Sequence, residues 1–486
     1  MIKPTYTQKQ LEFLAALSGK SLDNSGFISK AATMGYNPDP STGMTQGVQA
    51  LARQFLEPRL VSLTYKQGQL VFWNALRLGK EACDNTVYQY TVQDRHSFVG
   101  HGNTVVEGAI AAPTDPSFRR NLVYIKNLSK TSSVTLTAQL TNTLANVVET
   151  YTDDALVTLA NAIEWNSFYG DSSLTYQSGT GADQGTEFDG LSTLLEKEAP
   201  ENVIDASDGS GVPQPLSADI VNKAATLVAK GYSTPTDMFL PTGAVSSFMK
   251  NSGVQLVQLQ NSTPGVTGTV GFRPTAFNSV TGPIRIDSSN VMDNQNIYTE
   301  DNYNQLGDGL TPVVTATVDS AKKDGAFAKA DIGSLNYYVQ AVAGGRESAP
   351  ASVTAALVNQ TDAVELSIQV PSIYQARIEY VSIYRQSANG EYYLIGRIGT
   401  NTAVNGTITF RDVNDNIPGT TDAFIGELSP RTIKLVEQLP IAMLPLSQQN
   451  ATYNWTTLWY GALALLVPRA WVHIKNLEYM SVTPQY

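Results

Sequence analysis

Apolar side chains recur at helical spacing in four stretches of the chain, residues 8–17, 46–60, 152–170 and 218–230. The third stretch carries apolar positions on more than one face, a pattern typical of a helix packed on several sides. It predicts the central helix of a domain, with Thr152 as its N-cap. The two N-terminal stretches are too short to bury an apolar stripe of their own, so we expect them to lie against another surface.

Residues suited to helix ends flank the two later stretches. Asp153 and Asp154 follow Thr152 in the first turn, where the helix dipole favours negative charge. Gly170 stands where the helix should end and is suited to a left-handed cap. Ser217 is the predicted N-cap of the helix over 218–230.

Alternation with period two predicts strands over residues 86–92 and 121–125. The intervening residues contain several glycines and prolines and show no helical period. A loop longer than about 15 residues in a compact domain is usually functional or reaches a neighbour. We therefore predict a long hairpin arm.

A second series of segments with alternating apolar and polar residues begins near residue 311. Glycine, proline, asparagine and aspartate separate its alternating runs, which is typical of a two-sheet sandwich. The segment 337–342 followed by 348–350 resembles a fibronectin-like or immunoglobulin-like module. The runs are 313–318, 335–343, 352–358, 364–370, 379–384, 392–398 and 407–411.

Residues 427–486 contain two further strong strand patterns. Their apolar run 458–467 is shorter than the roughly 20 residues of a membrane helix, so it predicts a buried strand. These last residues cannot form a core alone, and we expect them to pack back on the middle of the chain. The sandwich is therefore predicted to be an insertion.

Composition narrows the class of function. The 486 residues include 32 Lys and Arg against 43 Asp and Glu, a net charge of −11. This balance argues against non-specific nucleic-acid binding and against docking on an anionic membrane. Charged residues make up only 15% of the chain, and uncharged polar groups cost less to desolvate than ions, which suits repeated protein contact.

Nothing in the composition indicates export. The single cysteine, Cys83, cannot form an internal disulfide, and the N-terminus lacks the pattern of a signal peptide. We expect a protein made in a cytoplasm, with no membrane partner.

Candidate enzyme chemistry is weak throughout. Residues 17–21 resemble the end of a phosphate-binding loop, but Leu14 stands where that loop needs glycine. His96 and His101 lack an acidic or thiol ligand nearby for zinc, and Cys83 lacks a base for nucleophilic catalysis.

Acidic residues also lack a complete catalytic or metal-binding pattern. Asp412, Asn414 and Asn416 have the spacing of a calcium loop, but position six is Ile417 instead of glycine, so a hairpin turn is preferred. The pair of Glu187 with a second acid two residues later could suit glycoside chemistry, yet nothing else supports it. We predict no enzyme activity, no catalytic residue, no metal and no cofactor.

Several segments resemble the major capsid proteins of large contractile-tailed bacteriophages. They occur in the expected order and span about residues 105–482. The segments are 108–116, 162–171, 187–191, 231–237, 380–385, 458–465 and 474–476.

The resemblance implies an α+β chain with the tailed-phage major capsid protein fold and an inserted all-β immunoglobulin-like sandwich. Its parts would be an N-terminal arm (1–80), an extended loop (81–125), a peripheral domain that contains the predicted central helix (126–215), an axial domain (216–309), the inserted sandwich (310–428) and a C-terminal return to the core (429–486).

The resemblance also implies partners. Subunits would form hexamers and pentamers that close into an icosahedral shell around double-stranded DNA without binding it specifically, and portal, scaffolding and decoration proteins would be further partners. Since each subunit carries −11, shell contacts must outweigh self-repulsion. Arg95, Arg119 and Arg120, in or beside the loop, are candidates for ion pairs between subunits.

Two other interpretations remain open on the sequence alone. One is a different phage structural protein, such as a tail sheath, which is also polar and rich in strands. The other is an adhesin-like binding module displayed through the sandwich.

Overall fold

The computed structural model describes most of the chain after residue 69, all of it within one compact unit that spans Ser62–Tyr486. The described residues are 70–76, 79–95, 106–108, 110, 115–140, 146–175, 185–251, 275–292, 310–370, 378–404, 406–448 and 451–479. The predicted helices at 8–17 and 46–60, the loop-like segment 17–21, and His96 with His101 lie outside these residues.

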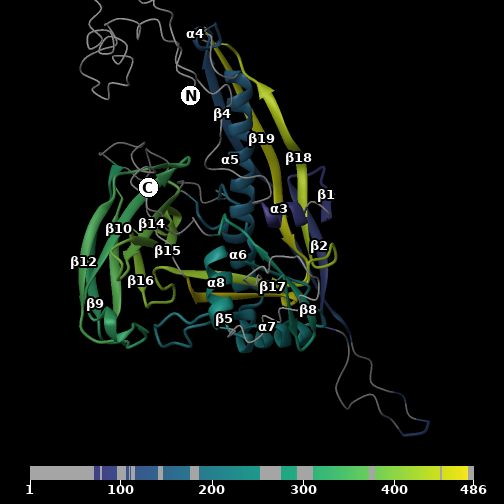
Figure 1. The fold of residues 1–486 in the computed structure, drawn as a ribbon, viewed down its shortest axis with the longest axis vertical. Coiled ribbons are helices and arrows are strands. Elements are labelled where there is room, and N and C mark those ends of the chain that lie inside the picture. Colours follow the sequence, from purple (N-terminus) through teal and green to yellow (C-terminus); the bar gives the residue numbers. More distant parts are fainter. Residues whose placement is uncertain are drawn as a thin grey trace, which may run out of the picture. The chain divides into compact units, whose positions relative to one another are not determined.

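A four-stranded sheet carries the central helix along one face. Figure 1 shows helix α5 (Val147–Tyr169) running beside strands β4 and β19. The strands β18, β19 and β4 pair antiparallel, and β1 joins β18 in parallel. The sheet order is β1 (Lys80–Ala82), β18 (Ile433–Pro445), β19 (Thr452–Leu465) and β4 (Lys126–Thr135).

The predicted ends of α5 need correction. The observed N-cap is Asn146, whose side chain accepts the Val148 N–H at 3.2 Å. Thr152 is wrong as the cap because it lies within the helix, where its hydroxyl donates to the Val148 carbonyl at 2.8 Å. The helix ends at Tyr169 as expected, but Gly170 has φ −58° and is not left-handed. A glycine is needed there because the Phe188 carbonyl oxygen occupies the space of a side chain.

A six-stranded sheet forms a second layer. Helices α7 (Ala218–Lys230) and α8 (Thr242–Asn251) contact it, and Ser217 caps α7 as predicted by accepting the Ile220 N–H. The order is β5 (Val203–Asp205), β20 (Trp471–Glu478), β17 (Thr420–Gly426), β6 (Asp237–Leu240), β8 (Gly282–Ser288) and β7 (Ala276–Ser279).

Strand β17 falls inside the range predicted for the sandwich, but it pairs with β20 and β6. The reason is its burial on both faces. Phe424 packs into the core beside α5, while Ala423 and Ile425 pack into the core beneath α7. The last strand of the sandwich in the structure is therefore β16.

The sandwich consists of two sheets around one core. All seven predicted strands are present, together with the short β11 (Arg346–Glu347). Tyr337 and Val339 of one sheet pack with Leu366 and Ile368 of the other. One sheet holds β12 (Ala351–Leu357), β10 (Gly333–Ala343), β11, β14 (Tyr380–Gln386) and β15 (Tyr392–Gly399); the other holds β16 (Thr407–Asp412), β13 (Ala363–Gln369) and β9 (Val313–Asp319).

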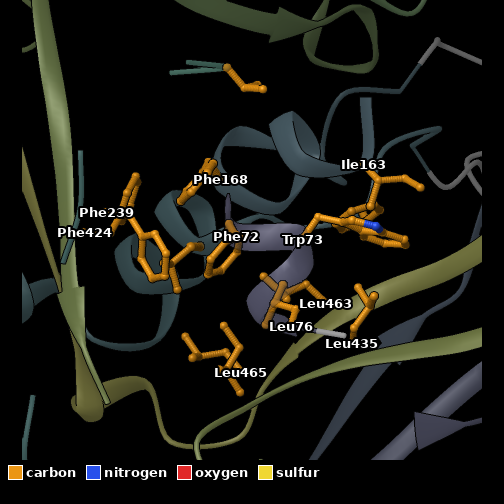
Figure 2. Close-up of a cluster of buried hydrophobic side chains, with 14 of the residues drawn as sticks. Phe72, Trp73, Leu76, Ile163, Phe168, Phe239, Phe424, Leu435, Leu463 and Leu465 are labelled. Carbon is orange, nitrogen blue, oxygen red and sulfur yellow. The ribbon is translucent and has the colours of Figure 1, made fainter. Parts of the chain in front are cut away.

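The main core is centred on a short helix, α3 (Val71–Leu76), as Figure 2 shows. The Phe72 ring stacks on Phe168 at 4.5 Å and meets Phe239 edge-on at 5.0 Å. Trp73 meets Trp459 edge-on at 6.1 Å. The core thus joins residues from α3, α5 and strands of both body sheets. No helix in the described part of the chain is both long and apolar enough to cross a membrane.

Candidate subunit-contact surface

Strands β2 (Val87–Arg95) and β3 (Ser117–Tyr124) form the predicted hairpin. They pair antiparallel from Val87 opposite Tyr124 to Arg95 opposite Ser117, with an irregularity near Gln93. Since directly opposite residues share a face, the register separates an inner from an outer face of this two-stranded ribbon.

The inner face lies against the rest of the same chain. The Tyr90 hydroxyl donates to the Leu465 carbonyl at 2.9 Å, and Val123 packs against the main core. Arg119 Nη2 lies 2.6 Å from Glu198 Oε2 at the end of helix α6 (Leu191–Glu198). These contacts fix which side of the ribbon faces away.

The outer face is exposed and carries an apolar row along β3, opposite the polar Gln89, Thr91 and Gln93 of β2. Phe118 is 64% exposed and Leu122 is 48% exposed, and Tyr124 continues the same row. Ile110, in the connection between the strands, is 96% exposed. An exposed apolar row on a ribbon whose other face is already covered marks an interaction surface.

The three arginines singled out from sequence lie in these strands. Arg119 has a partner within its own chain, Glu198, which the sequence pattern did not reveal. Arg120 shares the exposed outer face with Phe118 and Leu122. Arg95 ends β2, and its side chain lies outside the described residues. Their pairing between subunits stays a prediction. Sequence reasoning singled out these charges and overlooked the apolar row beside them.

The residues with the spacing of a calcium loop, Asp412, Asn414 and Asn416, make hydrogen bonds within the chain. The Asp412 carboxylate accepts hydrogen bonds from the Arg385 guanidinium and, at 2.9 Å, from the Tyr337 hydroxyl. The Asn414 side-chain oxygen accepts a further bond from Arg385. Asp412 and Asn414 bind a buried arginine, whereas the Asn416 side chain donates to the Ile395 carbonyl at 2.9 Å. The predicted hairpin turn is wrong, because β16 and the next strand, β17, lie in different sheets and do not pair. In the described part of the chain, no cluster of three or more His, Cys, Asp or Glu could hold a metal ion.

The remaining candidate groups make structural contacts. Both Glu187 oxygens accept from Arg397, at 2.8 and 2.9 Å, and Asp189 accepts the Ser172 N–H at 2.9 Å. Cys83 is half-buried, and its thiol donates to the Asn85 carbonyl at 3.1 Å.

Comparison with known proteins gives the family. Residues 41–303 match the family model "SU10 major capsid protein". The putative major capsid protein of Enterococcus phage phiEF24C is 37% identical over 93% of this chain and 95% of its own length. The major capsid protein of Staphylococcus phage K is 36% identical over 94% of this chain and 96% of its own length.

Among solved structures, the capsid of cyanophage P-SCSP1u covers 91% of this chain and 99% of its own, with 11% identity and a TM-score of 0.43. The sequence relatives carry the assignment: the chain belongs to the major capsid proteins of tailed phages. It is a structural protein of the phage head, and its place is the virion. This decides for the capsid and against the tail sheath and the adhesin-like module.

Proposed function

We propose that this chain assembles as hexamers and pentamers into an icosahedral head that encloses double-stranded DNA, and that its role is structural, without catalysis. The observation that supports this best is the outer face of the β2–β3 ribbon. Its apolar row is exposed, from 40% at Tyr124 to 64% at Phe118, whereas Val123 of the inner face packs against the main core. In a shell, a neighbouring copy of the chain would cover this row. Portal, scaffolding and decoration proteins are further proposed partners.

The net negative charge of the chain opposes this contact between copies. Each copy carries a net charge of −11, so copies repel one another at long range. Burial of apolar surface stabilises a contact by about 25 cal/mol per Å² removed from water. This stabilisation does not depend on the net charge of the two copies. An apolar row with a single arginine, Arg120, is therefore a contact that can form between like-charged subunits.

The decisive variant places a charge in the middle of this row. We expect Leu122→Asp to lower the yield of closed shells at least about 10-fold, because an unpaired carboxylate buried at the contact costs several kcal/mol. Electron microscopy with a sedimentation profile measures the yield.

Val313→Asp is the matched control. Val313 is 60% exposed on strand β9 of the sandwich, away from the ribbon, so its substitution should leave the yield unchanged. Circular dichroism of both variants separates an assembly defect from misfolding. Normal shell yields from folded Leu122→Asp would refute the proposed role of the row.

A further inference from the structure

The sandwich meets the body of the chain beside the C-terminal end of helix α5. It is inserted between strands β8 and β17 of the six-stranded sheet, so two connections join it to the body. Parts of a chain joined in this way usually move relative to one another unless their shared surface is large and apolar. Whether this sandwich moves therefore depends on the contacts at the junction.

One arginine of the sandwich makes three hydrogen bonds to the body. Arg397 of β15 donates from Nη1 to both oxygens of Glu187, at 2.8 and 2.9 Å, and from Nη2 to the Tyr169 carbonyl at 2.7 Å. The Arg397 and Glu187 side chains are only 11% and 14% exposed, so water competes little for these bonds. Hydrogen bonds between ionised groups are roughly twice as strong as neutral ones. Arg397 is therefore a strong link between the two parts.

The same guanidinium binds the end of the central helix in two further ways. Tyr169 is the last residue of α5, where the helix dipole favours a cation. The guanidinium also lies 4.7 Å from the ring centroid of Trp165 on α5 and 5.5 Å from that of Tyr380 on β14. Such cation–ring contacts add to the attraction. Arg397 is thus held by groups from both the body and the sandwich.

Backbone contacts beside Arg397 bring the two parts into direct contact. The Asn401 N–H donates to the Thr175 carbonyl at 3.1 Å. A side chain at Gly399 would place its Cβ 2.9 Å from the Ser173 carbonyl oxygen, closer than such atoms normally approach. The junction is therefore closely fitted next to the arginine.

We propose that Arg397 is a positioning residue, whose bonds to Glu187 and Tyr169 hold the sandwich in one orientation on the body. This role goes beyond the proposed assembly and does not rest on it, because every contact lies within one chain. In a shell, each copy would then present its sandwich in the same orientation relative to its own body.

Pulsed electron paramagnetic resonance on the purified full-length chain tests this role. Spin labels are attached at two exposed positions, through Lys223→Cys on α7 and Ser352→Cys on β12, in a Cys83→Ser background. We expect one narrow distribution of distances between the labels. Arg397→Gln removes the charge and shortens the side chain, and should broaden this distribution at least about 2-fold, because an inserted domain without a strong link moves.

Arg411→Gln is the matched control. Arg411 lies on β16 and pairs with Asp319 and Asp324, which both belong to the sandwich. Its loss should leave the distance distribution unchanged. Hydrogen exchange of the β10 amides shows whether the sandwich itself stays folded in each variant.

A second variant tests the junction without removing the arginine. Gly399→Ala inserts a Cβ against the Ser173 carbonyl, so the two parts must separate locally. We expect the distance distribution to shift or broaden although Arg397 is still present.

Three results would overturn the proposal. The first is a broad distribution in the chain that carries Arg397 and Gly399. The second is an unchanged distribution in Arg397→Gln with protected β10 amides. The third is loss of β10 protection in Arg397→Gln, which would mean that the arginine stabilises the sandwich itself and not its orientation. Because shell formation is not scored here, none of these results bears on the capsid role.

Discussion

Glu164 is the buried carboxylate of the main core. It lies on α5 with no exposed surface, accepts the Trp73 N–H at 3.3 Å and accepts the Ser289 hydroxyl at 2.6 Å. It thereby ties helix α3 to the central helix. Burial raises the pKa of Glu164 to about 6, although these hydrogen bonds oppose the rise.

The raised pKa of Glu164 predicts how the free energy of unfolding depends on pH. The stabilising contribution of protonated Glu164 is present below about pH 4.5 and is lost as the pH rises through about 6, a loss of about 2 kcal/mol. We expect Glu164→Gln to remove this step from the pH dependence of the unfolding free energy. The exposed Glu201→Gln serves as control and should retain it. A step that persists in Glu164→Gln would refute the assignment.

Glu164 shows why the role of a single buried residue is hard to infer from the sequence. Glu164 shares the buried stripe of α5 with Ala160 and Phe168, at spacings of four residues. A charge within an apolar stripe was a visible signal, but its partners Trp73 and Ser289 are distant in sequence. Local periodicity contains no information about them.

At the scale of elements, a buried ion pair joins the two sheets of the sandwich. Arg385 of β14 is 2% exposed, and its charge is balanced by Asp412 at the end of β16. The Arg385 guanidinium also lies over the Phe327 ring, 5.2 Å from the centroid. Removing one partner of such a pair leaves an uncompensated buried charge.

We therefore expect Asp412→Asn to destabilise the sandwich by about 3–5 kcal/mol. Hydrogen exchange of the β10 amides, in the centre of the sandwich, measures the loss. The matched control is Asp324→Asn, which breaks an exposed pair with Arg411 and should have little effect. Equal protection of β10 in both variants would contradict the importance of the buried pair.

Elements were predictable where their local pattern is strong. All seven sandwich strands follow from alternation, because each has one face on a shared core. The start of α5 was misplaced because Thr152 and the acids after it form a good capping pattern, yet Asn146 is also a good cap and comes first. Tertiary contacts with β4 extend the helix back to it.

At the scale of the whole molecule, distant segments complete each layer. The C-terminal strands β19 and β20 pair with β4 and β5, so the return of the chain was correctly expected from its lack of a core. The register between such strands is not contained in either strand alone, so the pairing of β17 with β6 could not be predicted. The domain boundaries stay a prediction.

The most direct test of the central claim is cryo-electron microscopy of shells assembled from the purified, overexpressed chain. We expect closed icosahedral particles of hexamers and pentamers, with the outer face of the β2–β3 ribbon in contact with a neighbouring subunit. Open helical tubes, or only monomers even when phage scaffolding factors are supplied, would contradict the account.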